Sequence, residues 1–297
     1  MSNPRPGPAP LPAAAPPRVR AALAAADGRR LTVLHRGRDA AYLTLDGPTD
    51  GPVDGPVNGS VVGIVTAGAA RVPCALRLAA PELPWLATLG GARVEDGVLH
   101  LDDVPVPIGR TLDVTVPRLR HRSRVERDSR VDSAARSLPG AALAALAGLD
   151  TEARPAALVA ALLGRGDGLT PLGDDVLCGW LALHRAAGQA PDLLLTEVRA
   201  EVAAQVGADG GRTGRLSAAL LDCALHGEVL PEFGDWVAAV DPAARAVAQT
   251  RLLAIGHTSG AGLLLGADLA LSHLSRRAGQ SGTPDRNRHR HERSACA

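Results

Sequence analysis

The residues best suited to chemistry lie in a glycine-rich stretch, GRGDGLTPLGDD at 164–175, which leads into an apolar run. Its two adjacent carboxylates, Asp174 and Asp175, suit Mg²⁺ binding or a role as a catalytic base. We expect Thr170 to cap a helix that begins at Pro171, so that Gly173 and both acids fall near its first turn. Free N–H groups at such a helix start suit an anion.

The glycines of this stretch favour a ligand site over a purely structural turn. The alternative is that the two acids merely favour the positive end of a helix, which contributes a few tenths to about 1 kcal/mol. That alternative does not account for glycine at 164, 166, 168 and 173, because glycine weakens a purely structural turn. We therefore expect Gly166, Gly168, Thr170 and Gly173 to contact a ligand.

A second cluster, GHTSG at 256–260, precedes the last apolar helical stretch. Its histidine, His257, can transfer a proton near neutral pH. The predicted ligand-binding residues of this cluster are Gly256, Thr258, Ser259 and Gly260. The alternatives are that Ser259 is an ordinary N-cap and that His257 is a loop histidine.

A third candidate is GGRTGRLS at 210–217, from which we take Arg212, Thr213 and Ser217 as ligand-binding residues. The chain has no lysine, so arginine must supply any fixed positive charge in a site. The alternative is the start of a surface helix.

Small residues predict how these clusters meet. The last predicted helix carries small residues at every fourth position, namely Gly262, Gly266 and Ala270. The predicted helix after Asp175 has a face of small residues of its own, formed by Gly179, Ala182 and Ala186. A glycine inside a helix costs about 1 kcal/mol relative to alanine, so close packing should offset it. We expect the two helices to cross closely and to bring their N-termini to one cleft.

The elements that must position these residues form two halves. Short β-branched or alternating runs punctuated by Gly, Pro and Asp occur between about 30 and 117, and helical periodicity dominates from about 122 onward. The predicted fold is α+β, with an N-terminal, mostly antiparallel sheet or small barrel and a C-terminal helical half. We expect a disordered tail at 1–17, a strand-rich domain at 18–121, a helical domain at 122–276 and a second disordered tail at 277–297.

Composition narrows the classes of protein. The hydrophobic fraction is 46% and the formal net charge is +1, which is typical of a globular protein. Aromatic residues make up only 2%, so stacking on nucleic-acid bases is not expected. No apolar run is long enough for a membrane span, and the four scattered cysteines indicate reduced thiols in a cytoplasmic protein.

The motifs at 166–175 and 256–260 resemble a family of domains of unknown function that includes AllH, a subunit assigned to oxamate carbamoyltransferase in anaerobic allantoin breakdown, a route of purine catabolism. The family's GLTPSGDD element matches 168–175, except that Leu172 stands where serine is usual. Residues 212–227 are also similar, with Thr213 and Ser217 at family-like positions. The resemblance implies carbamoyl transfer between carbamoyl phosphate and oxamate, or an oxalurate-like carboxylate, carried out with other enzyme subunits.

Together these observations favour a cytoplasmic subunit of a small-molecule enzyme that binds a small anionic substrate. In this hypothesis Asp174 and Asp175 bind Mg²⁺ or act as a base, and His257 transfers a proton. Two alternatives stay open, namely a non-catalytic partner subunit and a regulatory protein that binds a small ligand.

Overall fold

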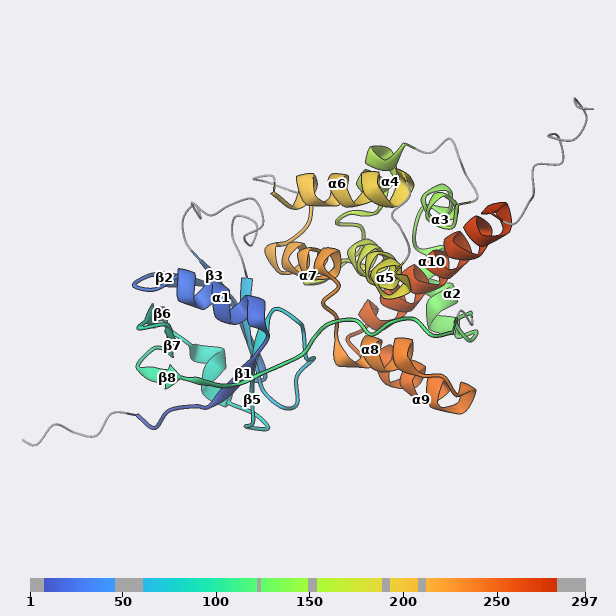
Figure 1. Cartoon of the computed structure of the whole chain (residues 1–297). Coiled ribbons are helices and arrows are strands. Elements are labelled where there is room, and N and C mark those ends of the chain that lie inside the picture. The colour runs from blue at the N-terminus through green and yellow to red at the C-terminus, as the bar shows by residue number, and fades with distance from the viewer. Residues whose placement is uncertain are drawn as a thin grey trace, which may run out of the picture.

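The computed structural model describes residues 8–45, 61–121, 124–148, 154–188, 193–207 and 212–281. Strands occupy the N-terminal part of this chain and helices the C-terminal part (Figure 1). The predicted α+β class is therefore confirmed.

The strand half is one nine-stranded sheet in the order β8-β7-β6-β2-β3-β4-β5-β1-β9. Its strands are β1 (Ala13–Ala15), β2 (Arg30–Arg36), β3 (Ala40–Leu45), β4 (Val61–Val65), β5 (Ala75–Leu78), β6 (Ala92–Glu95), β7 (Val98–Leu101), β8 (Val104–Val106) and β9 (Ile108–Thr111). Neighbours pair antiparallel except for the parallel pairs β4–β5 and β1–β9.

The two ends of this sheet lie close to each other, so that it is nearly a barrel. Only Pro107 separates β8 from β9 in the chain, although they stand at opposite ends of the strand order. In addition, the Leu11 N–H just before β1 donates to the Pro105 carbonyl of β8 at 2.9 Å. Helix α1 (Pro17–Ala25) and the 3₁₀ helix η1 (Pro84–Thr88) contribute Leu23 and Leu86 to its core.

Two expectations for the strand half are wrong. The predicted disordered tail at 1–17 contains β1, which places Ala13 and Ala15 in the core, while residues 1–7 lie outside the described chain. Residues 114–116 fall in the range where strands of the sheet were expected, but they run extended beside the helical half instead. There the Val116 N–H donates to the Gly227 carbonyl and the Val229 N–H donates to the Val114 carbonyl.

The helical half is built around two long helices, α5 (Leu172–Ala187) and α10 (Ser259–Ser281). The other helices are α2 (Ser129–Arg136), α3 (Gly140–Leu146), α4 (Pro155–Leu162), α6 (Leu193–Gly207), α7 (Arg215–His226), α8 (Pro231–Ala238) and α9 (Pro242–Leu253). Because α10 continues to Ser281, the expectation that disorder begins at 277 is wrong for 277–281; residues 282–297 lie outside the described chain. None of the helices within the described ranges is long and apolar enough to cross a lipid bilayer.

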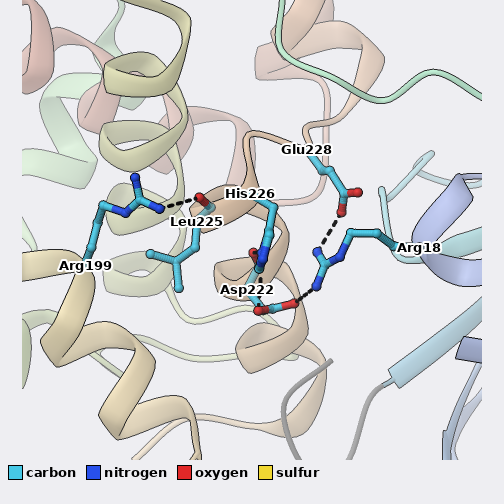
Figure 2. A network of polar contacts seen from close by, with 6 residues as sticks. All are labelled: Arg18, Arg199, Asp222, Leu225, His226 and Glu228. Atoms are coloured by element: carbon cyan, nitrogen blue, oxygen red, sulfur yellow. Dashed lines mark hydrogen bonds and ion pairs between the residues drawn. The ribbon is translucent and has the colours of Figure 1, made fainter. Parts of the chain in front are cut away.

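Helix α7 joins the two halves. Its Leu216 and Cys223 belong to a buried cluster with Tyr42, Val72 and Cys74 of the strand half. Polar contacts reinforce this joint, as Figure 2 shows. Arg18 of α1 donates to Asp222 near the end of α7 and, at 2.9 Å, to Glu228 just after this helix. The halves therefore share both an apolar and an ionic interface.

Candidate functional site

Helices α5 and α10 cross closely, as their small residues predict. A Cβ atom added to Gly179 would lie 2.1 Å from the Leu263 carbonyl oxygen, and one added to Gly266 would lie 2.0 Å from that of Val176. At Gly262, a Cβ would lie 2.7 Å from the Cβ of Asp175. Glycine at these positions lets the two backbones touch, so the N-terminus of α10 lies beside the first turn of α5.

The two motifs therefore meet in space. The Thr170 and Ser259 hydroxyl groups are hydrogen-bonded to each other at 2.8 Å, and Ser259 also bonds to the Asp175 carboxyl. Thr170 is not the N-cap that its position predicts. Helix α5 begins at Leu172 after Pro171, without a side-chain cap, and the Thr170 hydroxyl points to α10 instead.

Asp174 is fully buried and is held by donors from two other segments. Its Oδ1 accepts the Gly164 N–H at 2.7 Å, and its Oδ2 accepts the hydroxyl groups of Thr213 and, at 2.7 Å, Ser217. Burial raises the pKa of Asp174, while the hydrogen bonds from Thr213, Gly164 and Ser217 lower it. Thr213 and Ser217 thus face a carboxylate of this chain, and the Asp174 oxygens are engaged by its own donors.

Asp175 has a different environment although it is the next residue. Its side chain is 5% exposed, and its Oδ2 is buried with no hydrogen-bond partner among the described residues. Burial raises the pKa of Asp175 to about 8; the Ser259 hydrogen bond lowers it, and the Asp174 charge raises it further. At neutral pH the Asp175 carboxyl is therefore mostly protonated.

Asp175 lines a cavity of about 200 Å³ between the strand half and the helical half. Most of the lining is apolar and comes from both halves, for example Val72 from one and Leu216 and Phe233 from the other. The oxygen-bearing side chains of the lining belong to Tyr42, Thr170, Asp175, Glu228 and Ser259. The arrangement can hold a small molecule against one buried acid.

Of the other predicted site residues, some line this cavity and others do not. Gly256 lines it, whereas His257 is exposed in the turn before α10 and is not among the lining residues of the described chain. Arg212 is also exposed, and its guanidinium donates to the Ala160 carbonyl. Neither His257 nor Arg212 therefore lines the cavity that Asp175 lines.

The glycines of the two motifs are explained by backbone conformation and by close packing against other backbone segments. Gly166 and Gly168 have φ values of 111° and 98°, which favour glycine. A Cβ on Gly173 would lie 1.9 Å from the Leu162 carbonyl oxygen, and one on Gly260 would lie 1.9 Å from that of Leu252. Thr258 accepts the Gly262 N–H through its carbonyl. Ligand contacts of these residues stay predictions.

The carboxylate pair does not present an obvious Mg²⁺ site. No group of three or more His, Cys, Asp or Glu residues within the described ranges could hold a metal ion. Because N–H and O–H donors already face the Asp174 oxygens, only Asp175 offers a carboxyl oxygen without a partner. Mg²⁺ binding therefore stays a prediction.

Several lining residues were not predicted. Tyr42 and the loop at 70–73 come from the strand half, and Glu228 and Phe233 follow α7. Local sequence carries no signal that these segments face the 164–175 motif, because they approach it only through tertiary packing. The one available hint is that Tyr42 is the single tyrosine of the chain.

These features define a two-part α+β protein with a buried acid in a cavity at the joint between the parts. A comparison with protein families gives a more specific result. The model of the family described as oxamate carbamoyltransferase subunit AllH matches residues 162–271, a segment that contains both aspartates and Ser259. The match supports the predicted assignment of the chain to an AllH-like family. No curated protein and no solved structure gives a significant match.

Proposed function

We propose that the chain is a subunit of a carbamoyltransferase and that the cavity between its halves holds the small-molecule substrate. The observation that carries the proposal is the buried acid Asp175, which lines this cavity and is bonded to Ser259 of the second motif. The AllH family match supports the proposal, because the matched segment supplies Asp175 and the two hydroxyl groups beside it.

In the proposed reaction, oxamate or a related amide receives a carbamoyl group from carbamoyl phosphate. The amide nitrogen forms a bond to the carbamoyl carbon, the bond from that carbon to the phosphate oxygen breaks, and the phosphate leaves with the electron pair. The nitrogen must lose a proton, and Asp175 accepts it. A base whose pKa is about 8 suits this step, because efficient proton transfer needs a pKa near the working pH.

Other residues of the site position this acid. Ser259 and Thr170 form a hydroxyl chain that fixes the Asp175 carboxyl from the side of α10. Asp174 holds the turn at Gly164 and the start of α7 in place through its three hydrogen bonds. In this proposal Asp174 is a positioning residue, and partner subunits supply the groups that the cavity lacks.

The test uses the chain assembled with the products of neighbouring genes. Carbamoyl transfer to oxamate, and phosphate-dependent cleavage of oxalurate in reverse, are measured with and without Mg²⁺. Asp175→Asn should lower kcat by about 100-fold, since loss of a general base commonly costs that much. Asp167→Asn changes an exposed acid of the same turn, and we expect its activity to stay within about twofold of the unchanged protein.

The pH profile provides a second readout. The rate with the unchanged chain should rise with an apparent pKa near 8, whereas the residual rate of Asp175→Asn should lack this step. An Asp175→Asn chain that folds, assembles and keeps full activity would contradict the catalytic role.

A second candidate function is a non-catalytic, ligand-binding subunit. The exposed position of His257 favours it, because no histidine lines the cavity within the described chain to share in proton transfer. In that case Asp175→Asn would weaken substrate binding while leaving kcat unchanged.

A further inference from the structure

A second cavity lies in the helical half, at the end of α5 that is farther from the glycine-rich motif. Its volume is about 270 Å³, and residues of α5, α6 and α7 line it. Leu181, Leu195 and Leu225 form much of its apolar wall. Among the described residues, it shares only Ala224 of α7 with the lining of the cavity at Asp175. The two cavities are therefore distinct and lie on either side of a common helix.

Two arginines line this second cavity, and no acid does so within the described chain. Arg199 of α6 is half-buried, and Arg185, in the last turn of α5, is exposed. Both keep their positive charge, because arginine is not deprotonated in proteins. Burial lowers the pKa of Arg199 and the positive charge of Arg185 lowers it further, so the two cations are close enough to repel each other. An anion that joined them would remove this repulsion.

The acids at the end of α7 do not neutralise these arginines. Figure 2 shows Arg199 on one side of α7, at the Leu225 carbonyl, and Arg18 on the other side, at Asp222 and Glu228. Both acids are thus paired with Arg18. The positive charge of the second cavity therefore has no counter-charge among the acids of this network.

The two guanidinium groups have donors available for a ligand. Arg199 donates to the Leu225 carbonyl at 3.2 Å, which fixes its position, but a guanidinium carries five N–H donors. Arg185 makes no hydrogen bond or ion pair with the part of the chain that the structure describes. His184 adds its ring but no free nitrogen, since Nδ1 bonds to the Trp180 carbonyl at 2.8 Å and Nε2 to His273 at 2.9 Å.

We infer that this second cavity binds a small oxyanion of the phosphate class, held by Arg185 and Arg199. A planar guanidinium donates two parallel N–H bonds to oxygens of one phosphate, and the apolar wall strengthens such charged hydrogen bonds. The inference goes beyond the proposed function, because this cavity contains neither aspartate of the motif. The alternative is that Arg185 only stabilises the C-terminal end of α5.

Isothermal titration of inorganic phosphate into the isolated full-length chain tests the inference, at neutral pH and at an ionic strength held constant with sodium chloride. Arg185→Gln and Arg199→Gln should each weaken phosphate binding about tenfold or more, because each removes charge-assisted hydrogen bonds. Arg251→Gln is the matched control. It changes an exposed arginine in the last turn of α9, outside the lining, and should leave the affinity unchanged.

Circular dichroism and urea unfolding check that the variants are folded. Arg199→Gln loses the bond to the Leu225 carbonyl, whereas Arg185→Gln has no such bond to lose within the described chain. Absence of phosphate binding, or unchanged affinity in a folded Arg185→Gln chain, would overturn the inference. If Arg185 served only its helix end, Arg185→Gln and Arg251→Gln would lower stability alike and leave phosphate binding as it is.

A further variant separates this cavity from the one at Asp175, where the proposed function places the substrate. Ala70→Phe adds bulk to the lining of the Asp175 cavity, and Ala70 does not line the second one. A folded Ala70→Phe chain should still bind phosphate. Loss of binding there, together with normal binding by Arg185→Gln, would place the phosphate at the Asp175 cavity and refute the inference.

Failure of the inference is separable from failure of the proposed function. Phosphate binding that depends on both arginines, in an assembled complex without carbamoyl transfer, would refute only the proposed function. Carbamoyl transfer by a complex whose chain binds no phosphate at these arginines would refute only the inference.

Discussion

The ionisation of Asp175 leads to a stability prediction that needs no substrate. The pKa of this acid is about 8 in the folded chain, against 3.8 for an ordinary aspartate. The folded chain therefore keeps a proton that the unfolded chain releases above about pH 4. The contribution of Asp175 to the free energy of unfolding is therefore highest below that pH, falls as the pH rises from about 4 to about 8, and stays low above it.

The magnitude follows from the size of this pKa change. One pKa unit corresponds to about 1.4 kcal/mol, so the rise from 3.8 to about 8 sets an upper bound of roughly 6 kcal/mol. Water that enters the adjoining cavity would solvate the ionised carboxylate and reduce this penalty. We therefore expect at least about 2 kcal/mol of pH-dependent destabilisation from Asp175.

The perturbation is Asp175→Asn, which keeps the side-chain shape but cannot ionise. Urea unfolding followed by circular dichroism is measured between pH 5 and pH 9 for the unchanged chain and for the variant. The stability of the variant relative to the unchanged chain should rise by at least about 2 kcal/mol between pH 5 and pH 9. Asp167→Asn, an exposed change in the same turn, controls for surface charge.

Taking the difference between the two curves removes the contribution of all other titrating groups. A difference that is constant from pH 5 to pH 9 would refute the reasoning, because it would mean that Asp175 ionises alike in the folded and unfolded chains.

Three further changes test the packing by urea unfolding. Gly266→Ala should destabilise by about 2 kcal/mol or more, because the new Cβ would lie 2.0 Å from the Val176 carbonyl oxygen and this clash exceeds the gain in helix propensity. Gly234→Ala in α8, where a Cβ meets nothing closer than 3.6 Å, should instead stabilise by up to about 1 kcal/mol, and equal effects of the two changes would contradict the close crossing. Thr213→Val removes a hydrogen bond to a buried carboxylate and should cost about 1.5–3 kcal/mol; a neutral result would show that Asp174 does not need this donor.

The parts of the fold that depend on local spacing were predictable from sequence. Helix α7 (Arg215–His226) lies in the range of helical periodicity, and glycine flanks both ends of its apolar pattern at Gly214 and Gly227. The α5–α10 crossing was predictable because glycine is costly inside a helix, so Gly179, Gly262 and Gly266 indicate where another backbone must approach.

The site was less predictable because side-chain direction depends on tertiary structure. Adjacent residues of a helix point in different directions, so Asp174 and Asp175 do not act as a pair. One faces the Gly164 turn and α7, and the other faces the cavity. Likewise, the Thr170 hydroxyl bonds to Ser259 rather than to its own helix start, since α10 brings a partner that local sequence does not reveal.

The hydrogen bonds of Asp174 have a mechanical consequence. The same carboxylate anchors Thr213 and Ser217 on one side and belongs to the turn of α5 that carries Asp175 on the other. Helix α7 in turn supplies Leu216 to the cavity wall. A displacement of Thr213 or Ser217 would therefore act on Asp174 and, through it, on the turn of α5 that carries Asp175.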